Sequence, residues 1–220
     1  SYYGWGDGMN VFASNNVRYD SVFCRNSDDC HTVYATRKGF NGGCSNIVME
    51  NSTLWADVAH PINIGLHGSA AELGLDAAPD TITGLLYRNI DILDHQERQL
   101  DCQGCLTIVS GDNNLVKDIT FDNIRIDDIR IGRLFDIRIA MIKKYCAAPG
   151  GCIRDILFKD VTYNGNRAEV SFIIGYDPMR RVSGITFDNL VINGVRISDD
   201  MPGKPKWYKT GDMARIFIGE

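Results

Sequence analysis

The sequence predicts an all-β protein, a right-handed parallel β-helix of about six to seven coils. The first observation is a frame of apolar residues, apolar-x-apolar-x-x-apolar-x-apolar, that recurs along the chain. Its six copies begin at Val17, Ile47, Leu85, Ile119, Ile156 and Ile185. The repeat is therefore about 29 to 38 residues long, and a period in that range with strands in every repeat is typical of a solenoid.

The elements of each repeat follow from the alternation of side chains. Each frame is expected to form two short strands joined by a bend, because the alternation changes phase at a polar pair that often contains Asn or Asp. A second type of strand is expected after each frame, at 31–35, 62–66, 106–110, 135–140, 171–175 and 214–218, with an earlier copy at 9–13. The Ala-rich segment 69–75 is the one plausible helix. A leucine-rich horseshoe lacks its Leu-x-x-Leu-x-Leu-x-x-Asn frame here, and a β-sandwich would not need a constant repeat.

The bulk properties indicate one domain spanning residues 1–220. No Pro- or Ser-rich linker divides the chain, and its start within a coil suggests the C-terminal portion of a longer protein. A net charge of −5 disfavours nucleic acid or an anionic membrane as a partner. No apolar run is long enough to cross a bilayer. The oligomeric state is left open.

Seven cysteines bear on redox state and on metals. Cys146 and Cys152 flank a Pro-Gly-Gly loop, and Cys30 is within one coil of Cys44, so both pairs are candidate disulfides. Possible disulfides favour a secreted or periplasmic protein. Because there is no second Cys-x-x-Cys and no His pair at zinc spacing, we expect neither a metal nor another cofactor.

Acidic residues precede several strands of the second type. Asp7 precedes the strand at 9–13, Asp28 and Asp29 precede the next, and His60 precedes the third. If the coils stack in register, these side chains form one vertical cluster. Clustered carboxylates raise the pKa of at least one member, and one protonated beside one ionised carboxyl is what an acid–base hydrolase needs. The alternative is structural, since a lone Asp often caps a bend.

Three blocks of sequence resemble a clan of β-helical glycoside hydrolases. Gly6-Asp7-Gly8, Asp28-Asp29-Cys30 and His60-Pro61-Ile62 are similar to the successive motifs of the polygalacturonases, family 28. The Arg-Ile-Lys block of that family is missing from the expected coil at 105–110. The segment Asn26-Ser27-Asp28-Asp29 with Tyr34 is nearer to the dextranase and isopullulanase family, family 49. Without a basic pair to hold a carboxylate, a neutral glycan is favoured.

The resemblance implies hydrolysis of an α-glycosidic bond in a neutral, dextran- or pullulan-like polysaccharide, with inversion of the anomeric carbon. It implies that Asp28 is the general acid, and that Asp7 and Asp29 hold and deprotonate the water. His60 would orient Asp28 or hydrogen-bond the sugar. Candidates for stacking on sugar rings are Trp5, Tyr34 and Trp55.

Several alternatives remain open at this stage. They are a polygalacturonase-type pectin hydrolase, a calcium-dependent polysaccharide lyase, and a non-catalytic β-helix that binds glycan. The remaining histidines, His31, His67 and His95, are expected at the surface or in loops. The basic pairs Lys143-Lys144 and Arg180-Arg181 are expected to be solvated loop charges on distant coils.

Overall fold

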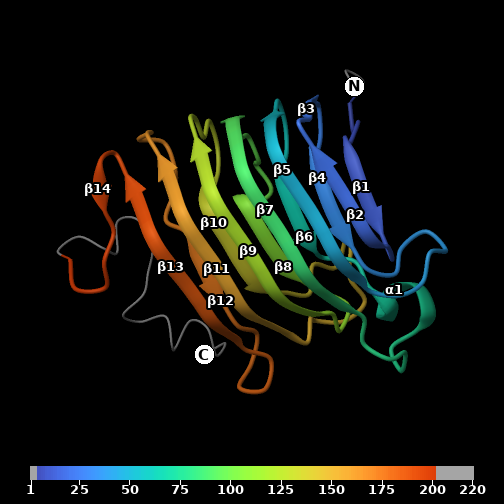
Figure 1. Cartoon of the computed structure of the whole chain (residues 1–220). Helices are drawn as coiled ribbons and strands as arrows, with labels where there is room; N and C mark the ends of the chain where they lie inside the picture. Colours follow the sequence, from blue (N-terminus) through green and yellow to red (C-terminus); the bar gives the residue numbers. More distant parts are fainter. Residues whose placement is uncertain (1–3, 202–220) are drawn as a thin grey trace.

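The computed structural model describes residues 4–201, which form an all-β protein dominated by two parallel sheets (Figure 1). The first sheet, termed the short-strand sheet, has six parallel strands. In spatial order they are β1 (Met9–Phe12), β4 (His31–Tyr34), β6 (Ile62–Gly65), β8 (Gly104–Ser110), β10 (Arg133–Ile139) and β12 (Phe172–Ile174). Each strand pairs in parallel with its neighbour. These strands are the predicted second-type strands.

The second sheet, termed the long-strand sheet, contains all six copies of the frame. In spatial order it consists of β2 (Asn15–Asp20), β5 (Cys44–Ala56), β7 (Thr81–Asp94), β9 (Leu115–Ile126), β11 (Cys152–Tyr163), β13 (Val182–Ile192) and β14 (Val195–Arg196). Strand β3 (Phe23–Asn26) also pairs with β5, and only β14 is antiparallel to its neighbour. The first apolar positions of the six frames are aligned from strand to strand, as the repeat predicts.

The bend inside each frame has a conformational cause. A column of aligned residues has positive φ: Ser21, Asn51, Asn89, Asn123, Asp160 and Asn189. Asn and Asp tolerate this left-handed conformation better than other residues that carry a Cβ, which explains the polar pair in the sequence. The side chains also join neighbouring strands, since the Asn89 amide donates to Asn51 Oδ1 at 2.7 Å. The predicted phase change is therefore a left-handed bend.

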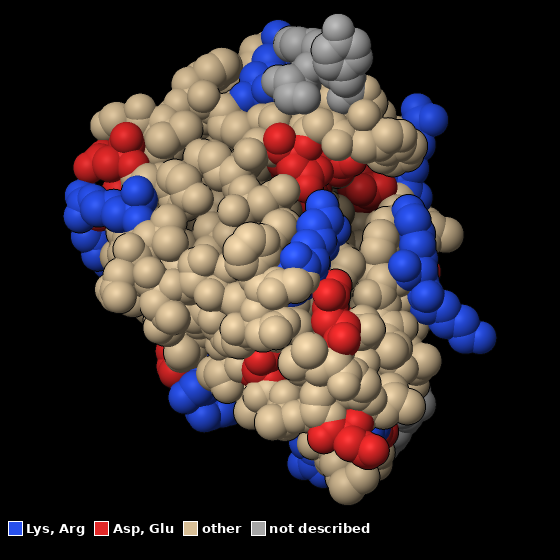
Figure 2. All heavy atoms as spheres, turned by 90° about the vertical axis from the view of Figure 1, so that its right-hand side faces the viewer, with Lys and Arg blue, Asp and Glu red and all other residues tan. Residues whose placement is uncertain are grey.

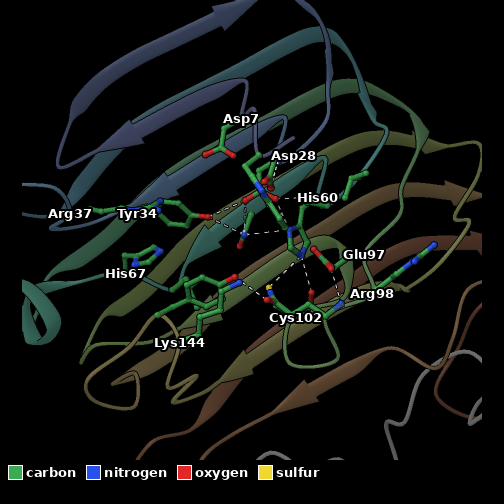
Figure 3. A pocket seen from close by; sticks show the side chains of 18 of the residues that line it. Asp7, Asp28, Tyr34, Arg37, His60, His67, Glu97, Arg98, Cys102 and Lys144 are labelled. Carbon is green, nitrogen blue, oxygen red and sulfur yellow. Dashed lines mark hydrogen bonds and ion pairs between the residues drawn. The ribbon is translucent and has the colours of Figure 1, made fainter. Parts of the chain in front are cut away.

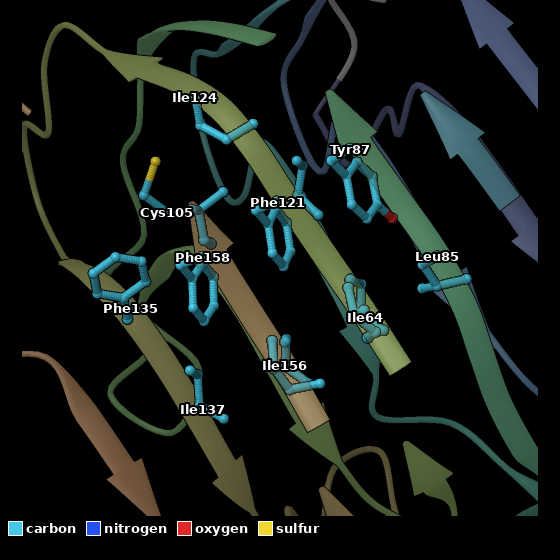
Figure 4. Close-up of a cluster of buried hydrophobic side chains, with 14 of the residues drawn as sticks. Ile64, Leu85, Tyr87, Cys105, Phe121, Ile124, Phe135, Ile137, Ile156 and Phe158 are labelled. Carbon is cyan, nitrogen blue, oxygen red and sulfur yellow. The ribbon is translucent and has the colours of Figure 1, made fainter. Parts of the chain in front are cut away.

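The hydrophobic core lies between the two sheets (Figure 4). On the long-strand sheet, Tyr87 stacks on Phe121 with ring centroids 4.9 Å apart, and Phe121 stacks on Phe158 at 4.8 Å. From the opposite sheet, Phe135 meets Phe158 edge-on at 4.8 Å. Aromatic pairs in such geometries add to the free energy gained by burial. Frame positions that align along the sheet thus become a continuous internal stack.

Other local predictions have mixed outcomes. The helix expected at 69–75 is present as α1 (Ser69–Leu73), whereas the strand expected at 214–218 lies outside the described residues. The histidine prediction is wrong for His31, which is fully buried in β4, whereas His95 lies in a loop as expected but is fully buried there.

The two predicted disulfides are absent, because all seven cysteines are free thiols. Cys44 Sγ contacts the carbonyl oxygen of Tyr34 at 3.2 Å, and Cys146 Sγ contacts that of Leu66 at the same distance. Both thiols thus point at backbone oxygens, and sequence spacing alone cannot supply those directions.

Candidate functional site

A cavity of about 840 Å³ opens beside the segments that precede the first strands of the short-strand sheet (Figure 3). It lies within the usual size range of ligand sites. Six of the seven predicted site residues line it: Trp5, Asp7, Asp28, Asp29, Tyr34 and His60. The structure thus brings together residues that come from three successive repeats.

Backbone hydrogen bonds between neighbouring repeats explain this convergence. The amide of Gly8 donates to the carbonyl of Asp29 at 2.8 Å, and the amide of Cys30 donates to the carbonyl of His60 at 2.8 Å. The ladder therefore continues beyond the strand ends, and the segments before β1, β4 and β6 stack in register. The vertical registry on which the sequence argument depends is confirmed.

Asp29 is the buried centre of the cluster. Its Oδ1 accepts the backbone amide of His60 at 3.0 Å and the His60 ring Nδ1 at 2.6 Å. Its Oδ2 accepts the Tyr34 hydroxyl at 3.1 Å and the Asn63 amide at 3.0 Å. Burial alone would raise the pKa of this carboxyl, but the His60 charge and these hydrogen bonds outweigh it and lower the pKa. Four donors occupy its four acceptor sites, so Asp29 has little capacity left to hold a water.

His60 completes a buried ion pair with Asp29. Its Nδ1 faces the carboxylate, and its Nε2 lies 3.0 Å from the carbonyl oxygen of Cys102. Two acceptors facing both ring nitrogens are satisfied only by the doubly protonated imidazolium. Burial would lower the pKa of His60, but Cys102 and the Asp29 carboxylate beside the ring raise it well above its ordinary value. His60 is therefore a fixed positive charge beneath the cavity.

Asp28 differs from Asp29 in burial, in hydrogen bonding and in the direction of its pKa shift. It is half-buried and its side chain accepts one bond, from the Asp29 amide at 3.0 Å. Burial raises its pKa to about 6, with the charges of Asp29 and Asp7 adding to the effect. A carboxyl with this pKa carries its proton at mildly acidic pH and is placed to donate it.

Asp7 is a second acidic side chain that lines the cavity. It is partly exposed, and the Asn10 amide donates to its Oδ2 at 2.9 Å. Asp7 and Asp28 both line the cavity (Figure 3). The pair thus consists of one protonatable and one solvated carboxyl.

The three aromatic candidates have different surroundings. Trp5 lies at the rim with 86% of its surface exposed, so its face is open to a ligand. Tyr34 lines the cavity but is buried, with Arg37 4.8 Å above its ring. Trp55 does not line this cavity, and the Arg25 guanidinium covers its ring at 3.9 Å. The structure therefore gathers Trp5 and Tyr34 but not Trp55.

Basic side chains that the sequence analysis missed also line the cavity. They are Arg37, Lys38, Arg98 and Lys144, from three different loops. The prediction that Lys144 is a distant loop charge is wrong. Figure 2 shows basic and acidic side chains lying next to each other on one face of the molecule. Sequence spacing gave no signal for this, because the conformation of the intervening loops decides it.

These four cations differ from most others in the protein. Arg25, Arg125 and Arg130, for example, form ion pairs with carboxylates at 2.9 Å or less. Within residues 4–201, no ion pair within 4.0 Å involves any of the four basic side chains in the cavity. The cavity therefore contains four cations outside close ion pairs, alongside the carboxyl groups of Asp7, Asp28, Asp29 and Glu97.

Comparisons with protein-family models, curated proteins and solved structures gave no match to this chain. Among the described residues, no group of three or more His, Cys, Asp or Glu side chains has the arrangement of a metal site. The same part of the chain contains no helix long and apolar enough to cross a membrane. Function is therefore argued from the geometry of the cavity.

Proposed function

We propose that this protein is a glycoside hydrolase that cleaves α-glycosidic bonds of a polysaccharide with inversion. The observation that carries the proposal is the presence in one cavity of Asp28, whose pKa is raised to about 6, and a second carboxyl, Asp7. Such enzymes require two carboxyls flanking the scissile bond, one that donates a proton and one that accepts a proton from water.

The proposal includes the finer description of the fold, a right-handed parallel β-helix. In support, the chain alternates between the two sheets, and each return to a sheet adds a parallel strand beside the previous one. Parallel crossovers are right-handed in nearly all proteins. Successive coils then present their corners on one wall, where a polysaccharide chain can lie across them.

In the proposed mechanism, the protonated Asp28 donates its proton to the glycosidic oxygen as the bond to the anomeric carbon breaks. Asp7 accepts a proton from a water that attacks the anomeric carbon from the opposite face. Inversion requires the two carboxyls to be about 6.5–9.5 Å apart, so that this water fits between them and the sugar. Trp5 offers an open ring on which a sugar can stack.

Asp29 and His60 have positioning roles in this proposal. The Asp29 carboxylate is saturated by hydrogen bonds, so the base function shared in the sequence prediction falls to Asp7 alone. The ion pair joins two repeats and fixes the loop that carries Asp28. The His60 charge also limits how far the pKa of Asp28 rises.

The proposed substrate class follows from the four basic side chains that line the cavity. The neutral glycan expected from the sequence rests on the lack of a basic pair near the acids. Arg37, Lys38, Arg98 and Lys144 supply unpaired positive charge in the cavity. Such charge favours a carboxylated or sulfated polysaccharide, and we place that class ahead of the neutral dextran- or pullulan-like glycans.

A glycan panel tests the proposal. The purified protein is incubated with polygalacturonate, a sulfated galactan, dextran, pullulan and arabinan, and reducing ends are measured. Anomer-resolved NMR of the first products then reports the stereochemistry. We expect release from an acidic glycan with inverted products. Retention of configuration would exclude the inverting mechanism, and activity on dextran alone would exclude the acidic substrate class.

Two other functions give different results in the same assay. A glycan-binding protein without activity would bind a member of the panel and release no reducing ends. A lyase would form unsaturated products that absorb ultraviolet light, and a calcium-dependent lyase would lose activity in the presence of a chelator. Either result would overturn the hydrolase proposal.

A further inference from the structure

Cys24 and Cys30 face one another across the loop that carries the acidic pair. Cys24 lies on β3, and Cys30 immediately precedes β4. Cys24 Sγ is 3.6 Å from the carbonyl oxygen of Cys30, and Cys30 Sγ is 3.8 Å from the carbonyl oxygen of Cys24. These reciprocal contacts turn both side chains toward the same space. The mechanism proposed above uses neither thiol.

The surroundings of the two thiols give them unequal acidity. A hydrogen bond from the Cys30 thiol lowers the pKa of Cys24, against the opposing effect of burial, while the same contact raises the pKa of Cys30. Cys24 is 8% exposed and Cys30 is fully buried. Cys24 is therefore the more acidic thiol and belongs to the less deeply buried of the two residues, which suits the attacking thiolate of an exchange reaction.

We propose that Cys24 and Cys30 are a disulfide-forming pair that, when oxidised, closes the loop carrying Asp28 and Asp29. The pair lies where two repeats meet, because a Cβ on Gly8 would be 2.6 Å from Cys24 Sγ. The disulfide would thus form next to Gly8, the residue that follows Asp7. This assignment differs from the pairing of Cys30 with Cys44 that sequence spacing suggested.

The oxidant in this proposal is a small-molecule disulfide such as oxidised glutathione. The Cys24 thiolate attacks one glutathione sulfur, forms a mixed disulfide and releases one glutathione thiolate. The Cys30 thiolate then attacks Cys24 Sγ and releases the second glutathione. The two protein thiols lose two electrons and two protons, and oxidised glutathione becomes two molecules of reduced glutathione. Cys30 is buried and cannot meet glutathione directly. The second step does not require this, because Cys30 attacks Cys24, a residue that it already contacts.

Peptide mapping tests the assignment directly. Trypsin cleaves after Arg18, Arg25 and Arg37, so Cys24 and Cys30 fall in the separate peptides 19–25 and 26–37. The protein is equilibrated with oxidised glutathione or with dithiothreitol. It is then unfolded in a denaturant that contains iodoacetamide, so that free thiols are alkylated, and digested without reduction. We expect one linked species after oxidation and two alkylated peptides after reduction. Alkylation of both cysteines after oxidation, or linkage of peptide 26–37 to the peptide with Cys44, would overturn the proposal.

Variants and thermal unfolding add a second readout. Cys24→Ser should abolish the linked species, whereas the matched control Cys152→Ser should keep it. Closing a loop of this size predicts a Tm higher by roughly 5–10 °C in the oxidised than in the reduced protein. Each variant is compared with itself in the two redox states, so a cost of the substitution cancels. An equal redox shift of Tm in Cys24→Ser would assign the effect to other cysteines and contradict the proposal.

Discussion

Replacement of Asp28 by Asn removes the proposed general acid while keeping the shape of the side chain. Positioned proton transfer contributes about 10²–10⁴-fold to a rate, so kcat should fall by that factor. The fold should be retained, because within residues 4–201 the Asp28 side chain accepts one hydrogen bond, from the Asp29 amide, and it is only half-buried. The amide of Asn keeps an oxygen that can accept the same bond.

The pH profile of the unmodified protein gives the second part of this prediction. Asp28 must be protonated to act, and burial raises its pKa to about 6. Above that value the protonated fraction falls about tenfold for each pH unit, so activity at pH 8 should be about a hundredth of the acid plateau. The raised pKa sets the midpoint of this fall, since an ordinary Asp would be deprotonated about two pH units lower.

The assay is reducing-end release from the glycan that the panel identifies, with thermal unfolding to verify the fold. An aryl glycoside of the same sugar serves as a second substrate, because its phenol leaves without a proton and the defect of Asp28→Asn should shrink on it. The matched control is Asp20→Asn, a change at an exposed carboxylate on β2. Activity of Asp28→Asn within a few-fold of the unmodified protein, or an equal defect on both substrates, would refute the role of Asp28.

Three further predictions concern the buried pair, the bends and acid stability. His60→Gln leaves the Asp29 carboxylate buried without its cation and should cost roughly 3–5 kcal/mol in urea unfolding; a loss below about 1 kcal/mol would show that the native pair is not ionised. Asn123 has φ of 59°, so Asn123→Ala should be less stable than the matched Asn123→Gly by roughly 1 kcal/mol, and equal stabilities would contradict the left-handed bend. Burial lowers the pKa of His31 to about 4, below its unfolded value near 6.5, so the unfolded chain binds the additional proton and stability is lost as pH falls between these values. Unfolding free energies from pH 7 to 4 should therefore fall more in the unmodified protein than in His31→Leu, and parallel curves would exclude the effect.

Much of the architecture can be predicted from the spacing of apolar residues. The frame beginning at Ile119 predicts two strand segments and a bend, and the structure places both in β9 with Asn123 at the left-handed bend. Local alternation is sufficient here because side chains in a strand point to opposite faces in turn. The registry of Asp7 with Asp28 and His60 follows from the same constant repeat.

The structure decided what local spacing cannot encode. Asp28 and Asp29 are adjacent and chemically identical in sequence, yet one keeps an available carboxyl and the other is saturated by Tyr34, His60 and Asn63. Both residues lie in the turn between β3 and β4, where no strand alternation fixes the side-chain directions, and two of the partners of Asp29, His60 and Asn63, come from the next repeat. The roles of acid and structural anchor are therefore set by tertiary contacts.

The sequence by itself determined the repeat, the strands and the column of acidic residues, because these depend on a period that stacking preserves. Only the tertiary structure decided the cations of the cavity, the burial of His31 and His95, and the pairing of thiols. Arg37 and Lys144 are more than 100 residues apart, and irregular loops carry both to one cavity. The conformation of a loop depends on many weak contacts rather than on a repeat, so no local sequence pattern predicts where its side chains lie.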